Sequence, residues 1–122
     1  MLVIFVRWAM SFAMLALLVP ALALAARQPT LSEREAITAA LPAGFKRYPV
    51  GCIFLRIAVS SNGGYARVTP VVLNGLRQPC LKYAGNGYWI FRKVTRWKVV
   101  FAGSVPPPCS LRVPRDLARC AP

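Results

Sequence analysis

The residues whose types and spacing could do chemistry lie between Gly87 and Gly103, in the stretch GYWIFRKVTRWKVVFAG. Basic side chains and aromatic rings are interleaved there, a combination that binds phosphates and other anions. The simpler alternative is a β-hairpin that buries its aromatics and leaves one polar face in solvent. The pattern favours the hairpin for most of the rings. The candidate anion-binding face is the set of cations that this leaves outside: Arg92, Lys93, Arg96 and Lys98.

Residues for catalysis are scarce. The sequence contains no histidine, and its three acids, Glu33, Glu35 and Asp116, fall at predicted helix starts, where capping explains them. General acid–base catalysis usually needs histidine or paired carboxylates. The glycines also lack the spacing of a phosphate loop. We therefore expect a protein that is not an enzyme, with no catalytic, cofactor-binding or metal site, and rank an enzyme working through serine, lysine and tyrosine last.

The cysteines indicate disulfides. Metal sites favour close cysteine pairs, and the smallest gap here runs from Cys109 to Cys120. An even number of cysteines in a small exported chain indicates a disulfide framework, with three pairings open for four residues. The favoured pairing joins Cys52 to Cys80 and Cys109 to Cys120.

The first 26 residues have the features of a secretory signal peptide. Arg7 precedes a long uncharged apolar run that ends in small residues with an A-x-A pattern. We expect cleavage after Ala25 or Ala26, which leaves residues 27–122 as one small secreted, periplasmic or cell-envelope domain. The alternative is a retained membrane anchor over residues 8–26, a stretch just long enough to span a bilayer.

The charge is strongly positive. The full chain carries 16 Lys and Arg against three acids, a formal net charge of +13, and loss of the signal would remove only Arg7. Such an excess favours anionic partners of any kind, including lipid headgroups, envelope polymers, nucleic acid and acidic proteins.

A helix is predicted over residues 32–41. Ser32 and Glu35 have the spacing of a capping box, and Pro42 and Gly44 would end the helix. Its apolar stripe, which would cover one face of a sheet, consists of Ala36, Ile37, Ala40 and Leu41.

A first hairpin follows. Alternating residues predict a strand over 53–59, the SNGG segment at 61–64 is a turn signal, and a returning strand is expected over 65–73. Pro70 indicates that the second strand is an edge or is bulged there.

A second hairpin is predicted over 88–92 and 96–102. A two-residue loop of Val94 and Thr95 would force β-branched residues to positive φ, so a three-residue loop is favoured. The residues then expected in the core are Trp89, Phe91, Trp97, Val99 and Phe101. The residues then expected outside are Tyr88, Arg92, Arg96 and Lys98.

The tail after residue 104 begins with three prolines. Pro114 and Asp116 predict a single helical turn that ends near Cys120. The predicted fold class is α+β: a short N-terminal helix packed on an antiparallel sheet of about four strands in two hairpins, with a disulfide-stapled C-terminal tail.

The region from Cys52 to Cys120 resembles small exported proteins of unknown function that are common in actinobacteria. The resemblance rests on a W-x-V-V-x-x-G strand that leads into a proline-flanked cysteine and a final cysteine, and on an S-x-x-x-x-x-Y-A-x-V element. The matching positions are Trp97, Val99, Val100, Gly103, Cys109, Leu117, Cys120, Ser60, Tyr65, Ala66 and Val68. The resemblance implies export and a compact α+β fold, and it brings no activity.

The function that these observations favour is an exported, non-catalytic binding module for an anionic envelope component or an acidic protein. Beside the four hairpin cations, Lys46, Arg47 and Arg56 are candidates for the same surface. The alternative is a cationic effector that acts on membranes or nucleic acid through bulk charge.

Overall fold

The computed structural model describes residues 25–43, 51–73, 80 and 85–122. Helix α1 (Leu31–Ala39) packs on a four-stranded antiparallel sheet whose order is β1-β2-β3-β4. The predicted α+β fold class is confirmed. The strands are β1 (Ile53–Val59), β2 (Tyr65–Val72), β3 (Tyr88–Lys93) and β4 (Trp97–Gly103), and a 3-10 helix, η3, spans Cys109–Leu111.

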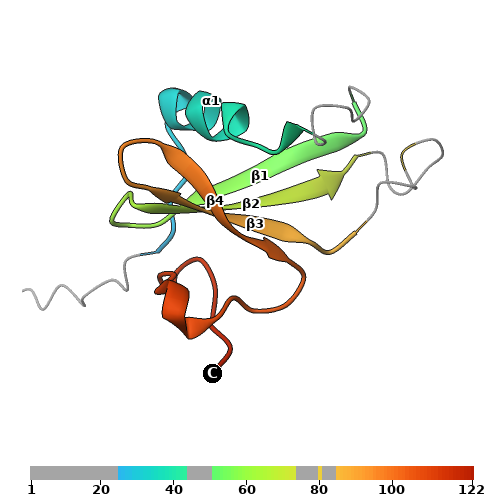
Figure 1. The fold of residues 1–122 in the computed structure, drawn as a ribbon. Helices are drawn as coiled ribbons and strands as arrows, with labels where there is room; N and C mark the ends of the chain where they lie inside the picture. Colours follow the sequence, from blue (N-terminus) through green and yellow to red (C-terminus); the bar gives the residue numbers. More distant parts are fainter. Residues whose placement is uncertain (1–24, 44–50, 74–79, 81–84) are drawn as a thin grey trace, which may run out of the picture.

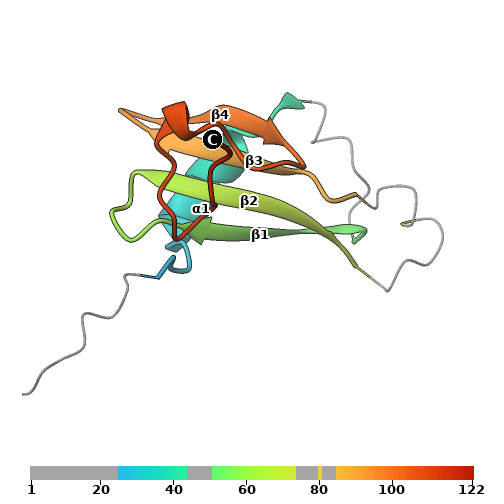
Figure 2. The ribbon, with the colours of Figure 1, turned by 90° about the horizontal axis from the view of Figure 1, so that it is seen from below.

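The sheet is covered on both faces (Figure 1). Helix α1 lies on one face, which we name the helix face, and residues 104–122 lie on the other, which we name the tail face. Figure 2, seen from below, has this tail in front of the strands and α1 behind them. The predicted signal peptide lies almost wholly outside the described residues, as do Lys46 and Arg47. No helix in the described ranges is long and apolar enough to cross a bilayer.

The N-cap of helix α1 lies two residues before the predicted one. The cap is Thr30, whose hydroxyl accepts a hydrogen bond from the Glu33 amide while the Glu33 side chain accepts one from the Thr30 amide. The box predicted at Ser32 and Glu35 is therefore wrong. Two overlapping segments have the same spacing, and only Glu33 also reaches Arg27, so the earlier box has the extra stabilisation.

The first hairpin has the predicted strands and turn. Gly63 adopts φ +74°, and the Asn62 side chain accepts hydrogen bonds from the Ser60 hydroxyl and the Gly64 amide. Pro70 lies on β2 opposite Leu55, beyond the last described pair of β2 with β3 at Val68. β2 is an inner strand and pairs regularly with β1 at Pro70, so the predicted edge strand or bulge is wrong. The proline is tolerated because no described pair of β2 with β3 extends that far.

The second hairpin has the predicted three-residue loop, since Lys93 pairs with Trp97. A bulge between Ile90 and Phe91 makes Val100 an extra residue, so that Phe101 faces the tail instead of the helix. The prediction that Phe101 joins the helix-side core is therefore wrong. Tyr88 points away from α1 as expected, but it is 7% exposed because the tail covers it, so the prediction that it lies outside is also wrong.

Two apolar clusters result, one on each face. Phe91 is fully buried in the helix-face cluster, and Ile90 is fully buried in the tail-face cluster. The buried members of the helix-face cluster are Ile37, Leu41, Ile57, Val59, Ala66, Val68, Phe91 and Trp97. Those of the tail-face cluster are Tyr88, Ile90, Val113, Leu117 and Ala118.

Both disulfides are present in the favoured pairing, Cys52–Cys80 and Cys109–Cys120. They fit an oxidising location for this part of the chain. A hydrogen-bonded turn starts at Pro114, as predicted. Asp116 lies in that turn, as predicted. Its carboxylate accepts a hydrogen bond from the Ser61 amide in the first hairpin turn, so the expected capping role is wrong, and Asp116 instead ties the tail to the sheet.

Candidate functional site

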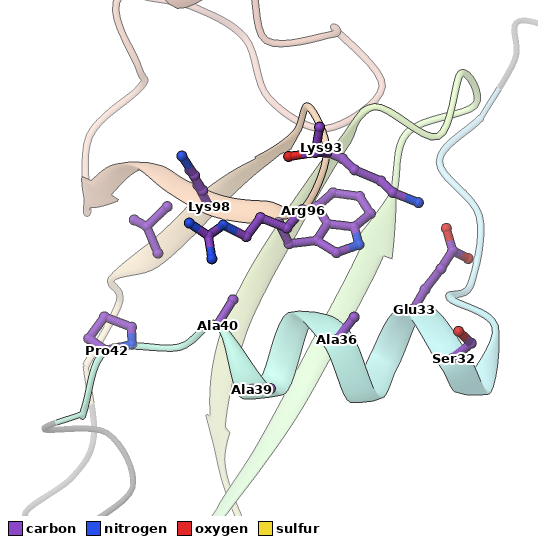
Figure 3. Close-up of a pocket in the computed structure, with 12 residues that line it drawn as sticks. Ser32, Glu33, Ala36, Ala39, Ala40, Pro42, Lys93, Arg96 and Lys98 are labelled. Carbon is purple, nitrogen blue, oxygen red and sulfur yellow. The ribbon is translucent and has the colours of Figure 1, made fainter.

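A groove of about 680 Å³ runs between α1 and the β3–β4 hairpin, and we name it the α1–β4 groove. One wall comes from the helix and the other from the hairpin (Figure 3). Its residues from the helix side are Ser32, Glu33, Ala36, Ala39, Ala40 and Pro42. Its residues from the hairpin are Lys93, Thr95, Arg96, Trp97, Lys98 and Val99. The helix wall is made largely of alanine, so small side chains leave space that larger ones would fill.

Three of the four predicted anion-binding residues line this groove. Arg96, in the hairpin loop, extends over the end of the helix near Ala40, and Lys93 extends toward the end of the groove where Glu33 lies (Figure 3). The Lys93 ammonium lies 5.9 Å from the centre of the Trp97 ring, a cation–π contact. Lys98 lies at the rim, and its ammonium points away from the helix (Figure 3).

The groove cations have no acidic partner among the described residues. Glu33 is engaged by Arg27, whose two terminal nitrogens donate to its carboxylate at 2.7 and 3.0 Å. The hydrogen bond from Arg27 is the main cause that lowers the pKa of Glu33 to about 2, with help from the Thr30 amide and against the effect of burial. Because the charge of Glu33 is already matched by Arg27, the positive potential of Lys93 and Arg96 is left uncompensated.

The structure separates the remaining predicted cations. Arg92 alternates with Lys93 along β3 and lies on the tail face, where its guanidinium is 5.8 Å from the centre of the Tyr65 ring. Arg56 is exposed on β1, at the opposite edge of the sheet from β4. The four hairpin cations therefore do not form one face.

The apolar part of the groove was missed from the sequence. Ala36 and Ala40 belong to the predicted apolar stripe, but Ala36 is exposed to the groove and only Ile37 and Leu41 of that stripe are buried. Ala39, the other groove alanine, lies one turn after Ala36. The sequence did contain a signal for the groove: several alanines on a helix that packs beside a tryptophan leave space between the two.

Several residues on which the resemblance to exported proteins rests are buried in the fold. Ser60 is fully buried and its hydroxyl accepts from the Tyr65 amide at 3.1 Å, while Trp97 and Leu117 are buried in the two clusters. The described residues contain no group of three or more side chains suited to hold a metal ion. No family model, curated protein or solved structure matches this chain. The likeness to exported actinobacterial proteins stays a prediction.

Proposed function

We propose that this chain is an exported, non-catalytic binding module that holds an acidic protein segment in the α1–β4 groove. The observation that carries the proposal is the groove itself, in which cations without acidic partners lie beside an apolar surface, which we name the groove floor. The floor consists of Ala36, Ala39, Ala40 and Val99. Buried aliphatic side chains on the partner would contact Ala36, Ala40 and Val99, and its carboxylates would pair with Lys93 and Arg96. Charge complementarity of this kind gives both specificity and a fast association rate.

The floor favours a protein segment over a bare polyanion. Single-stranded nucleic acid binds to exposed aromatic rings on which bases stack, and Trp97 is only 5% exposed. An envelope polyphosphate would use the cations but gain nothing from the alanines. In the described part of the chain no strand pairs with the outer edge of β4, so an extended segment can add its backbone to that edge.

Export and the absence of catalysis rest on different support. The two disulfides and the signal-like first 26 residues support export. A sequence without histidine supports a non-catalytic role, as does the engagement of Glu33 by Arg27 and of Asp116 by a backbone amide. Intact mass of the protein from its host tests export: a mature chain starting at Ala26 or Arg27 supports it, and a full-length chain in the membrane fraction contradicts it.

The groove is tested with matched charge variants. Lys93→Gln with Arg96→Gln removes two groove cations, and Arg56→Gln with Arg119→Gln removes two exposed cations elsewhere. The probes are a synthetic peptide in which Glu and Leu alternate, polyglutamate of equal charge, and single-stranded RNA, with binding measured by fluorescence anisotropy at two salt concentrations.

We expect the alternating peptide to bind tighter than polyglutamate, and the groove pair to weaken it by about tenfold while the control pair has an effect of about twofold or less. Equal weakening by the two pairs would contradict the proposal and favour a cationic effector that acts through bulk charge. Tighter binding of RNA than of the peptide would also contradict it.

A further inference from the structure

A second cavity lies on the tail face, on the other side of the sheet from the groove. Its volume is about 290 Å³, and it lies where the start of β2, the end of β3 and the middle of β4 meet η3. The residues that line it are Tyr65, Arg92, Val100, Ser110, Leu111 and Arg112. Its lining residues thus include two arginines, a serine and a tyrosine, and no acid.

The sheet side of this cavity is held in place by Tyr65. Its hydroxyl donates to the Leu111 carbonyl at 3.1 Å, which fixes the ring between β2 and the tail. Arg92 is the strand partner of Tyr65, and its guanidinium packs over the ring with 5.8 Å between the guanidinium carbon and the ring centre. No acid in the described part of the chain forms an ion pair with Arg92. Its guanidinium is therefore positioned without being neutralised.

The tail side is held in place by a left-handed arginine. Arg112 ends η3 with φ 53° and ψ 36°, and it is the one non-glycine residue with positive φ among the described residues. The Cys109–Cys120 disulfide and a hydrogen bond from the Arg112 amide to the Cys109 carbonyl hold this turn. Glycine adopts this conformation without the steric cost that an L-side chain has there. An arginine at such a position points to a use for its side chain, and Arg112 is one of the residues that line the cavity.

We propose that this cavity binds a phosphate-sized oxyanion, a phosphate monoester or a sulfate. Arg92 and Arg112 would donate to its oxygens from the sheet and from the tail, and the Ser110 hydroxyl would donate a third hydrogen bond. Planar guanidinium groups suit phosphate oxygens, and hydrogen bonds between ionised partners are the strong ones. Two like charges lining one cavity repel each other, and a dianion between them relieves that repulsion. This site stands apart from the proposed function, because it shares no residue with the α1–β4 groove.

The test is titration of the mature, oxidised protein with inorganic phosphate at constant ionic strength, followed by amide chemical shifts. We expect saturable shifts around Arg92 and Ser110. Arg112→Gly keeps the left-handed turn and removes the guanidinium, so the variant should melt at the same or a higher temperature and bind phosphate about tenfold more weakly. Arg92→Gln should also weaken phosphate binding. It serves as the second variant should Arg112→Gly lower the melting temperature.

Two controls separate this site from bulk charge and from the groove. Arg115→Gln removes one exposed tail cation outside the cavity and should leave phosphate affinity unchanged. Lys93→Gln with Arg96→Gln should weaken the acidic peptide but not phosphate. The proposal is wrong if phosphate gives no saturable shifts, or if Arg112→Gly and Arg115→Gln weaken binding equally.

The source of the oxyanion is distinguished by competition. Vesicles that contain phosphatidic acid and soluble glycerol 3-phosphate carry the same group. If the vesicles bind and glycerol 3-phosphate displaces them, the site takes a lipid headgroup. If only the soluble ester binds, it takes a free ligand.

Discussion

The two faces of the sheet are covered in different ways. On the helix face, α1 satisfies its own backbone internally, and Ile37 and Leu41 pack against the strands. One side-chain hydrogen bond, from Arg34 to the Leu55 carbonyl, also joins the helix to the sheet. On the tail face, an irregular segment brings carbonyl groups that its own backbone does not satisfy. Side chains of the sheet satisfy them: Tyr65 donates to Leu111, Tyr88 to Val105 and Arg67 to Leu117.

This difference extends to the two proposed sites. The groove on the helix face is mostly apolar, because a helix of small residues beside a tryptophan leaves an unfilled hydrophobic gap. The cavity on the tail face is polar, because polar side chains of the sheet and a disulfide hold the tail in place there. We expect the stability of the helix face to depend mainly on the volume of its buried side chains. We expect the stability of the tail face to depend mainly on its hydrogen bonds and its disulfide.

The largest effect should come from Phe91→Ala. Phe91 is fully buried in the helix-face cluster, so the variant should lose about 3–5 kcal/mol of unfolding free energy, the usual cost of emptying such a site. Leu117→Ala, in the tail-face cluster, is the companion variant, and its loss should be smaller because the irregular tail can close around the gap. Urea denaturation measures both. A larger loss of unfolding free energy for Leu117→Ala than for Phe91→Ala would contradict the expected difference between the two faces.

The next effect concerns the tail disulfide. Cys109→Ser with Cys120→Ser opens a link between residues 11 apart, which should cost about 3 kcal/mol through the greater freedom of the unfolded chain. Hydrogen exchange should show faster exchange in residues 104–122, with the amides of α1 and β1 protected as before. Uniformly faster exchange over both faces would mean that the tail and the sheet unfold as one unit.

The smallest effect is the acid response of the α1 cap. Arg27 holds the pKa of Glu33 at about 2, below its ordinary value of 4.5, so the ion pair stabilises the folded protein above pH 4.5. That stabilisation is lost as the pH falls through 2. Melting curves between pH 2 and 7 should show this loss in the unaltered protein and in Glu35→Gln, and not in Glu33→Gln. If all three proteins show the same dependence of melting temperature on pH, the Arg27–Glu33 ion pair is not the cause of the acid response.

Much of the fold follows from local patterns. The alternation of residues 53–59 and the SNGG turn specify the first hairpin, and the unfavourable φ of Val94 and Thr95 in a short loop specifies the second. A bulge carries no such pattern, so the rotation of Phe101 to the tail face was not predictable from alternation alone. The cap was misplaced because two segments share the same spacing, and a contact with Arg27 decides between them.

The sites were predictable only in part. The sequence identifies the cations, but the strand register decides which face of the sheet each one lies on. The larger side chains opposite Ala36 and Ala40 in the groove come from the β3–β4 hairpin, which is far from the helix in the sequence. The tail cavity depends on contacts between residues far apart, such as Tyr65 with Leu111. Nothing local to Arg112 indicates its left-handed conformation, so that part of the cavity comes from the structure alone.

The central claim is that the helix face and the tail face carry separate binding sites. The most direct test is one set of amide chemical-shift titrations on the mature, oxidised protein, with the alternating Glu-Leu peptide and with inorganic phosphate in turn. We predict that the peptide shifts α1 and the loop of Lys93 and Arg96, that phosphate shifts Arg92 and residues 110–112, and that neither ligand displaces the other. Shifts at the same residues for both ligands, or shifts spread over every exposed cation, would contradict it.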